Sequence, residues 1–599
     1  MALTPTRRGV RLPDAGVGPR GARLGAWAVL GALLAATLAG AVAYRPPSDR
    51  PLPGDGATHL LQAASLAFDG DLAWSRGDLE RFTAHRGRPP EAVVLRSPDR
   101  GERITFGVPM PWAVAAAPFV RLAPVRGPAV ANACFLALAA LAAAATLERR
   151  LGPAAPLWVA AFVFASVAFV YTFRPTPELF TACLVALAFA LAYRGEGQPP
   201  GRFAEVYAGA LPGEEAGRGL GRWGAVGALV ATAAALHPFY LALLLPLALA
   251  APAGRRRLGA AVLVLSAVVA LAAWGGLGAA AGAGWLPWER DGRLFTPETG
   301  FPAADLPVSL WPAAGSGPEW LPGGPPDTVL DARLLGWNAL FLAGGRHLGV
   351  LPYFLPLVLG FLAFRGERGR GAIPLAVAGA VAGFLLVRPF DLAGAGDPVA
   401  AACFLPLYPA LWFLAARPVR PGWVVVAAIL AAPYLYPSWL APRAVAAGAP
   451  YASAVARRIL PLETTQSALP GVAEVQHGPL WVRLSAGGIA AGPRGTLRLA
   501  LGRGGELWIG SAVEPSALRL ELDPGGPTQA EIAGAELLRT VLTPRGVVVF
   551  VLDPGAPERR HPVAWSTGPY VFYRLGVALP GNEPGRPVGF RIVPVFGEP

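Results

Sequence analysis

Apolar runs follow one another along the chain from residue 26 to residue 440, separated by short polar connections. A helix of about 20 apolar residues crosses the hydrocarbon core of a bilayer. The pattern therefore predicts a mainly α-helical, polytopic transmembrane bundle of about eleven spans, over residues 26–44, 128–147, 153–172, 177–193, 222–236, 238–252, 258–281, 347–364, 371–388, 399–416 and 422–440.

Arginine residues distinguish one side of this predicted bundle from the other. The short connections 173–176 and 389–398 hold only Arg174 between them. Arginine-bearing connections tend to stay in the cytoplasm, so we expect residues 1–25 to form a cytoplasmic tail and the side of Arg174 to be exported. The connections predicted to be cytoplasmic all contain arginine: 148–152, 194–221, 253–257, 365–370 and 417–421.

Two exported loops, residues 45–127 and 282–346, are predicted to be long. Loops of such length in a compact protein usually carry function. Within the first loop, residues 107–124 are apolar but contain several prolines. Counting this stretch as a span would move every later arginine-bearing connection to the exported side, so we expect an interfacial or re-entrant helix there.

After residue 461 apolar and polar residues alternate, as in LWVRLS (480–485) and LRLELD (518–523). Turn sequences such as DPGGP and DPGAP separate these stretches, and this combination is typical of β-strands. Residues 462–599 are therefore predicted to form an extracytoplasmic β-sandwich domain after the transmembrane domain of residues 26–461.

The composition supports a membrane protein and argues against a nucleic-acid-binding one. Charged residues make up 15% of the chain, whereas soluble proteins carry about 25%. The net charge of +13 comes from arginine alone, since the chain has no lysine, and the arginines lie beside apolar runs, where they set topology. We expect membrane lipid as a partner and no nucleic acid.

The first exported loop contains a candidate catalytic acid, Asp55, in the sequence GDGATHLLQ. A helix over residues 57–68 would place His59 one turn after Asp55. An aspartate beside a membrane cavity can act as a general base toward a sugar hydroxyl. The alternative is an N-cap, because an aspartate before a helix commonly has that role.

Four more residues are candidates at the exported face. Glu178, in YTFRPTPELF, is a second candidate acid or a residue that complements the helix dipole. Arg174 would pair with it or hold a phosphate. His237 would contact an anionic head group or mark a break between two helices, and Arg346 is a candidate phosphate ligand. No nucleotide-binding or zinc signature is present in the sequence.

The order of several motifs resembles the GT-C superfamily of membrane glycosyltransferases, and within it a bacterial family close to the dolichyl-phosphate-mannose-type and lipopolysaccharide-core transferases. The resemblance covers most of residues 26–470, and LPLETTQ leads from it into the exported domain. The motifs are GDGATHLLQAASLAFDGDL, ITFGVPMPWAVAAAPFVRL, YTFRPTPELF, NALFLAGGRHLGVLPYFLP and GAGDPVAAACFLPLYPALWF.

The resemblance implies a protein of the bacterial inner membrane that transfers a sugar, with inversion, from a polyprenyl-phosphate-linked donor to a glycan, lipid or protein acceptor on the periplasmic side. Asp55 would align with the family's base, Glu178 with a second acidic position, and Arg346 with a residue that holds the lipid phosphate. His59, Arg174 and His237 would be further substrate-binding residues. A divalent cation is a candidate cofactor, but no residue is assigned to it.

Two departures from the family pattern leave an alternative open. Gly56 stands where family members commonly have a second acid, and Ala402 and Cys403 stand where many have an arginine. A non-catalytic relative that binds a lipid-linked glycan or scaffolds envelope assembly would tolerate both changes. A transporter is a weaker alternative, because it predicts inverted repeats and charged residues in mid-membrane, which this sequence lacks.

Overall fold

The structure is a computed structural model. The described residues are 19–47, 52, 54–90, 93–96, 104–194, 212–251, 256–282, 293–295, 301–302, 332–364, 369–387, 392, 399–416, 420–447, 451–461, 463, 474–477, 480–484, 488–491, 497–500, 504–511, 515–522, 531–542, 548–555, 571–578 and 588–595.

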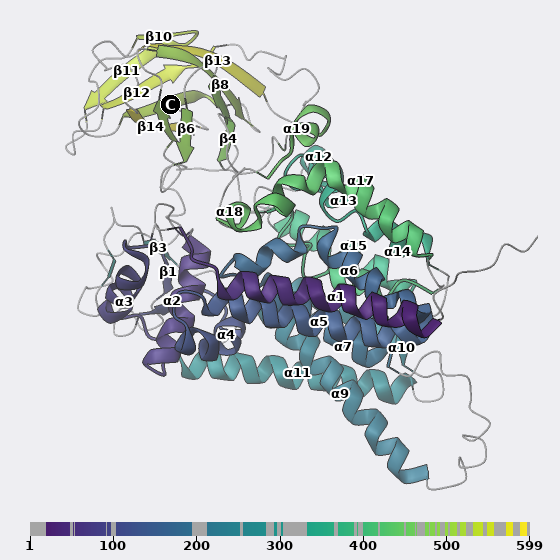
Figure 1. Ribbon diagram of the computed structural model, residues 1–599. Helices are drawn as coiled ribbons and strands as arrows, with labels where there is room; N and C mark the ends of the chain where they lie inside the picture. The colour runs from purple at the N-terminus through teal and green to yellow at the C-terminus, as the bar shows by residue number, and fades with distance from the viewer. Residues whose placement is uncertain are drawn as a thin grey trace, which may run out of the picture.

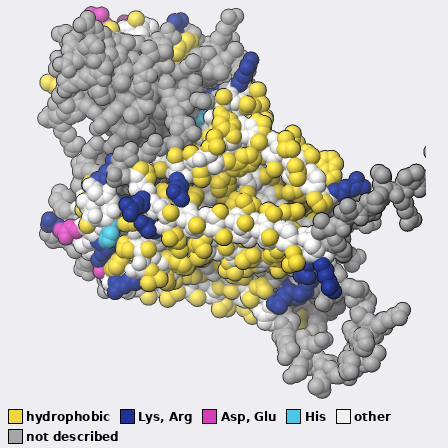
Figure 2. Space-filling view, in the orientation of Figure 1, with side chains coloured by type: hydrophobic (Ala, Val, Ile, Leu, Met, Phe, Trp, Pro, Cys, Tyr) yellow, Lys and Arg dark blue, Asp and Glu magenta, His cyan; other side chains and the backbone are white. Residues whose placement is uncertain are grey.

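The chain is a multi-pass membrane protein. Large side chains stay exposed on its long helices, and Leu265 and Ile429 are 65% and 63% exposed. Figure 2 shows a broad band of apolar side chains with arginine side chains at its ends. This is the surface that a bilayer requires. Among the residues that the structure describes, four stretches are long and apolar enough to cross a membrane: Arg20–Val42, Gly127–Phe164, Arg256–Ala280 and Pro421–Leu440. They contain α1 (Pro19–Val42), α5 (Gly127–Leu151), α6 (Ala155–Phe164), α11 (Arg256–Ala280) and α17 (Pro421–Leu440).

The other predicted spans contain shorter helices, so the number of eleven stays a prediction. Residues 347–364 are divided between two short helices, and residues 399–416 contain one helix of five residues. Proline is frequent in both, and it interrupts helices because it lacks the backbone N–H. These shorter elements are α7 (Glu178–Ala192), η3 (Pro238–Leu243), α10 (Leu244–Ala250), α13 (Val350–Tyr353), α14 (Leu357–Leu362), α15 (Ala372–Val387) and α16 (Tyr408–Trp412). α9 (Pro212–Leu236) has 25 residues, but its apolar part is the shorter stretch Leu220–Leu236. α12 (Ala332–Gly344) lies in the loop predicted over residues 282–346.

Small residues allow the helices to pack closely. Ala140, Ala143 and Ala144 of α5 are fully buried, and α5 packs against α7. Gly227 of α9 lies against α11, where an added Cβ would overlap the carbonyl oxygen of Leu263. Because lipid provides little hydrophobic drive for helix association, close packing of this kind holds membrane helices together.

The two long loops form one unit, which is called the exported unit below after its predicted side of the membrane. β1 (Val93–Arg96) of the first loop pairs with β2 (Thr105–Phe106) on one side and with β3 (Arg293–Phe295) of the second loop on the other, both antiparallel. Trp74 Nε1 also donates to the carbonyl oxygen of Pro302 at 2.8 Å. The unit includes α2 (Gly54–Phe68), α3 (Arg76–Arg86) and α4 (Pro111–Leu122), which gather at one end of the helical body (Figure 1). α4 is the helix predicted over residues 107–124.

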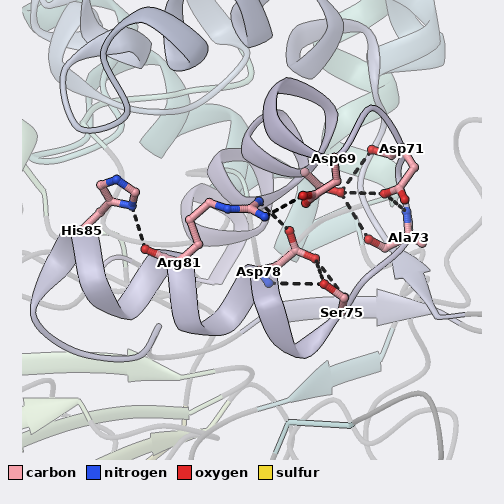
Figure 3. Close-up of polar contacts among 8 residues, drawn as sticks. Asp69, Asp71, Ala73, Ser75, Asp78, Arg81 and His85 are labelled. Atoms are coloured by element: carbon pink, nitrogen blue, oxygen red, sulfur yellow. Dashed lines mark hydrogen bonds and ion pairs between the residues drawn. The ribbon is translucent and has the colours of Figure 1, made fainter.

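The corner between α2 and α3 is fixed by side-chain bonds (Figure 3). Ser75 caps α3 and forms a reciprocal capping box with Asp78. Arg81 bridges Asp69 at 2.7 Å and Asp78 at 3.2 Å. His85 Nδ1 lies 2.7 Å from the carbonyl oxygen of Arg81. The carboxylates of this corner are therefore occupied in holding the loop together.

The C-terminal region contains two antiparallel sheets, with strand orders β10-β13-β8-β5-β4 and β11-β12-β9-β14-β7-β6. Two such sheets are what a sandwich requires, and their face-to-face packing stays a prediction. Figure 1 shows these strands together at one end of the molecule, beyond α18 (Pro442–Ala446) and α19 (Ala454–Ile459). The strands are β4 (Glu474–His477), β5 (Leu480–Leu484), β6 (Gly488–Ala491), β7 (Leu497–Ala500), β8 (Gly504–Ser511), β9 (Ala517–Leu522), β10 (Glu531–Ala533), β11 (Glu536–Leu542), β12 (Val548–Asp553), β13 (Val571–Ala578) and β14 (Val588–Val595).

Candidate functional site

The first turn of α2, which carries Asp55, packs against the junction before α7. A Cβ added to Gly56 would lie 3.7 Å from the ring of Pro175. The Asp55 side chain lies outside the described residues, but its helix begins at Gly54, so Asp55 stands in the first turn and not before it. This start does not fit the N-cap alternative, in which Asp55 precedes the helix.

Arg174, in the same junction, is held by its backbone and its guanidinium. Its side chain is buried, and its carbonyl oxygen accepts from Asn132 Nδ2 of α5 at 2.5 Å. Arg174 Nη1 donates to the carbonyl oxygen of Ala446 at 3.4 Å, and the guanidinium lies over the ring of Tyr171 at 5.8 Å. The junction is thus held by Asn132 of α5, by the carbonyl oxygen of Ala446 and by the Tyr171 ring.

A chain of contacts connects His59 to this junction. The His59 ring lies edge-on to Trp112 of α4, 5.7 Å between centroids, and Trp112 Nε1 donates to Asn132 Oδ1 at 3.2 Å. Asn132 in turn bonds the carbonyl oxygen of Arg174. The structure therefore brings two predicted substrate-binding residues, His59 and Arg174, into one frame built by α2, α4 and α5.

His59 is neutral at physiological pH. Burial lowers the pKa of its imidazole to about 4, because an apolar environment disfavours the charged form. Its Nδ1 is buried and forms no hydrogen bond with the described residues. This nitrogen is able to donate to or accept from a polar group that enters the frame.

Glu178 is the first residue of α7 and is half-buried at the same junction. Both Glu178 and Arg174 lie within electrostatic range of the Tyr171 hydroxyl. That hydroxyl donates to the carbonyl oxygen of Val399 at 2.7 Å. An acidic and a basic side chain therefore flank one phenol where the first turn of α2 meets the start of α7.

Arg346 lies in a second cluster, which Glu463 organises. One carboxylate oxygen of Glu463 accepts the backbone N–H groups of His347 at 2.5 Å and Leu348 at 2.7 Å. The other lies 3.0 Å from His347 Nδ1. The Arg346 side chain is buried, and its backbone N–H donates to Pro461 at 2.9 Å. The residues just before the β-strand region thus clamp the turn that carries Arg346.

Residues 399–400 connect the two clusters. Tyr451 Oη donates to the carbonyl oxygen of His347 at 2.5 Å and accepts the N–H of Ala400 at 2.8 Å. Val399 accepts from Tyr171, beside Arg174. Ala400 has a positive φ of 59°, a conformation that non-glycine residues adopt only where the surroundings impose it. The predicted residues Arg174 and Arg346 are therefore linked through a cation–π contact, buried hydrogen bonds and the backbone between them.

His237 lies in an aromatic cluster. Its ring centroid is 4.1 Å from that of Phe384 of α15 and 4.9 Å from that of Phe239. These contacts suit the alternative of a break between two helices, since His237 separates α9 from η3.

Within the residues that the structure describes, no group of three or more histidine, cysteine, aspartate or glutamate side chains is arranged to hold a metal ion. The Asp55 carboxylate falls outside that search.

The sequence analysis did not identify Glu463 as a site residue. The only signal in the sequence is its position, because LPLETTQ places an acid shortly after the last predicted span.

Comparisons with known proteins give one structural likeness. No protein-family model matches the sequence, and no curated protein matches it. The structure is similar to the crystal structure of ArnT from Cupriavidus metallidurans bound to undecaprenyl phosphate, with 15% sequence identity and a TM-score of 0.39. The match covers 70% of this chain and 62% of that protein, so this chain spans less than two thirds of its length.

Proposed function

We propose that the chain is a membrane glycosyltransferase that transfers a sugar from a polyprenyl-phosphate-linked donor to a cell-envelope acceptor on the periplasmic side. The observation that supports this proposal best is the contact between Gly56, beside Asp55, and Pro175, between Arg174 and Glu178. Since a Cβ added to Gly56 would lie 3.7 Å from the Pro175 ring, this proximity supports a shared place for the candidate base, the second acid and the phosphate ligand.

In the proposed reaction, Asp55 removes the proton of the acceptor hydroxyl. The hydroxyl oxygen then forms a bond to the anomeric carbon of the sugar. The bond from that carbon to the phosphate oxygen breaks on the opposite face, and the polyprenyl phosphate leaves with the electron pair, so the configuration inverts. Arg174 and Arg346 would stabilise the charge on the leaving phosphate, while Glu178 and His59 would orient the sugar or the acceptor.

Replacement of the proposed base tests this function. We expect Asp55→Asn to lower the rate of sugar transfer about 10²- to 10⁴-fold, since general base catalysis is worth that much. The measurement is consumption of polyprenyl-phosphate sugar by the purified full chain in proteoliposomes. The matched control is Glu80→Gln, because Glu80 is an exposed acid of the same exported unit. An Asp55→Asn variant as active as the control would remove the proposed base.

A second candidate function rests on Gly56, where family members commonly have an acid. A non-catalytic relative would bind the polyprenyl-phosphate sugar without turnover. Binding of the donor by the wild-type chain, with no transfer to any offered acceptor and no donor hydrolysis, would favour this function over the transferase.

A further inference from the structure

Arginine side chains from three separate elements converge around Tyr44, two residues after the end of α1. Arg86 at the end of α3, Arg174 in the junction before α7 and Arg443 of α18 all lie within electrostatic range of the Tyr44 hydroxyl. Arg88 lies within the same range of Arg86. These four arginines and Tyr44 are called the Tyr44 cluster below.

No carboxylate neutralises the Tyr44 cluster within the described part of the chain. Its four arginines form no ion pair there, whereas Arg81, on the same helix as Arg86, pairs with two aspartates. Arg443 Nη2 donates to the carbonyl oxygen of Gly40 at 3.1 Å, and Arg174 bonds the carbonyl oxygen of Ala446. These two bonds use a small share of the ten N–H donors that two guanidinium groups carry.

Two members of the cluster have unused polar atoms. Arg88 Nη2 is buried and forms no hydrogen bond with the described residues. Tyr44 is only 6% exposed, and within the described residues burial and the three arginines act on its hydroxyl, with no hydrogen bond among these influences. Burial and the neighbouring Arg88 lower the pKa of Arg86. Arg86 and Arg88 are half-buried and Arg174 is buried, and buried cations without a counter-charge are unfavourable, so the cluster is suited to an anion that the described part of the chain does not supply.

The position of the Tyr44 cluster indicates which anion it binds. The Phe173 ring contacts both the Tyr44 ring, at 5.3 Å, and the Arg443 guanidinium, at 5.9 Å. The cluster therefore lies where α1 leaves the apolar band. Figure 2 shows arginine side chains gathered at the end of that band where Figure 1 places α3 and α18. An anion at this depth is carried by a lipid, and guanidinium groups bind phosphate oxygens in pairs.

We propose that Arg86, Arg88, Arg174 and Arg443, with the hydroxyl of Tyr44, form a binding site for one phosphate group carried by a membrane lipid. The phosphate belongs to an acidic phospholipid head group or to a polyprenyl phosphate, which share this chemistry. The site shares Arg174 with the proposed function, but it would bind its phosphate whether or not sugar transfer takes place. It does not include Arg346, whose turn is held by Glu463 and Pro461.

Lipid binding to the purified full chain in detergent tests the site. The probes are polyprenyl phosphate, phosphatidylglycerol and inorganic phosphate, and native mass spectrometry counts the bound molecules over a concentration series. We expect the double variant Arg86→Gln/Arg88→Gln and the single variant Arg443→Gln each to weaken binding of at least one lipid about 10- to 100-fold, as the loss of charge-assisted hydrogen bonds would. Arg443→Lys should recover part of the affinity, since it restores the charge without the paired donors.

The matched control is Arg76→Gln, because Arg76 is an exposed arginine of α3 that pairs with Glu80. Loss confined to polyprenyl phosphate identifies a donor-type lipid, and loss confined to phosphatidylglycerol identifies a bilayer lipid; either supports the site. Equal affinity of wild type, variants and control for both lipids overturns it, as does binding of inorganic phosphate alone. An unchanged elution volume and melting temperature show that the variants fold. No readout is turnover, so failure of the proposed glycosyl transfer leaves this test intact.

Discussion

At the scale of single residues, burial of His59 predicts a loss of stability in acid. The pKa of its imidazole is about 4 in the folded chain, below its ordinary value of 6.5. As the pH falls below 6.5, the unfolded chain binds a proton that the folded chain does not. Stability should therefore decline from about pH 6.5 to about pH 4, by up to about 3 kcal/mol, and decline no further from this cause at lower pH.

Thermal unfolding in detergent at pH 7 and at pH 4.5 measures this decline. His59→Gln should unfold with a smaller difference between the two pH values than wild type. His85→Gln is the control, because His85 is an exposed histidine in the same exported unit, and it should retain the wild-type difference. If His59→Gln and His85→Gln show the same dependence on pH, His59 does not stay neutral in the folded chain.

Residue positions were predictable from sequence where topology alone decides them. Arg174 and Glu178 stand at a short connection between two apolar runs, on the side predicted to be exported, and the structure places both beside Tyr171. Glu463 was not predictable, because its partners His347 and Leu348 lie 116 and 115 residues away. A carboxylate that accepts backbone N–H groups from a distant segment leaves no local sequence pattern. Nothing in the residues around Glu463 distinguishes it from an acid that is exposed to solvent.

At the scale of elements, hydropathy located the long helices, but it also predicted continuous helices in runs where the structure has only short ones. The run 26–44 corresponds to α1, and 422–440 corresponds to α17. The runs 347–364 and 399–416 are equally apolar, yet the structure divides them into short helices and turns. An average over apolar residues does not register single prolines, each of which removes a helical hydrogen bond. Prolines alone do not decide the division, however, because α17 continues through Pro433 and Pro437.

Close packing of α9 on α11 gives a prediction for one glycine. A Cβ at Gly227 would overlap the carbonyl oxygen of Leu263 and the hydroxyl of Ser266. Gly227→Ala should therefore push the two helices apart and destabilise the chain by about 1–3 kcal/mol, as overpacking does. The measurement is the melting temperature of the purified protein in detergent.

Gly221 is the matched control on the same helix, since nothing lies within 4 Å of a Cβ built there. Alanine has the higher helix propensity by about 1 kcal/mol, so Gly221→Ala should melt at or above the wild-type temperature. Equal melting temperatures for both variants would mean that α9 and α11 do not meet at Gly227.

At the scale of the whole molecule, the pairing of the exported loops could not be predicted from sequence. β1 has four residues and β3 has three, and they lie about 200 residues apart. Strands this short have no measurable periodicity. That both loops lie on one side follows from the arginine pattern, but only the register of Val93 with Phe295 shows that they form a single sheet. The sheet holds α2, with Asp55, at a defined place over the bundle.

The predicted orientation places this exported unit and the β-strand region on the same side of the membrane. Single cysteines test it in a background in which Cys134, Cys183 and Cys403 are replaced by alanine. The reporter positions are Glu80 of α3, Glu531 of β10 and Pro153 of η1 (Gly152–Ala154), all exposed in the structure. A membrane-impermeant maleimide added to right-side-out vesicles should label Glu80→Cys and Glu531→Cys but not Pro153→Cys, and in inside-out vesicles the result should reverse. Labelling of residues 80 and 531 from opposite sides would place the β-strand region and the candidate site on different sides of the membrane. Labelling of residues 80 and 153 from the same side would overturn the arrangement of spans that places Asp55 and Glu178 at one face.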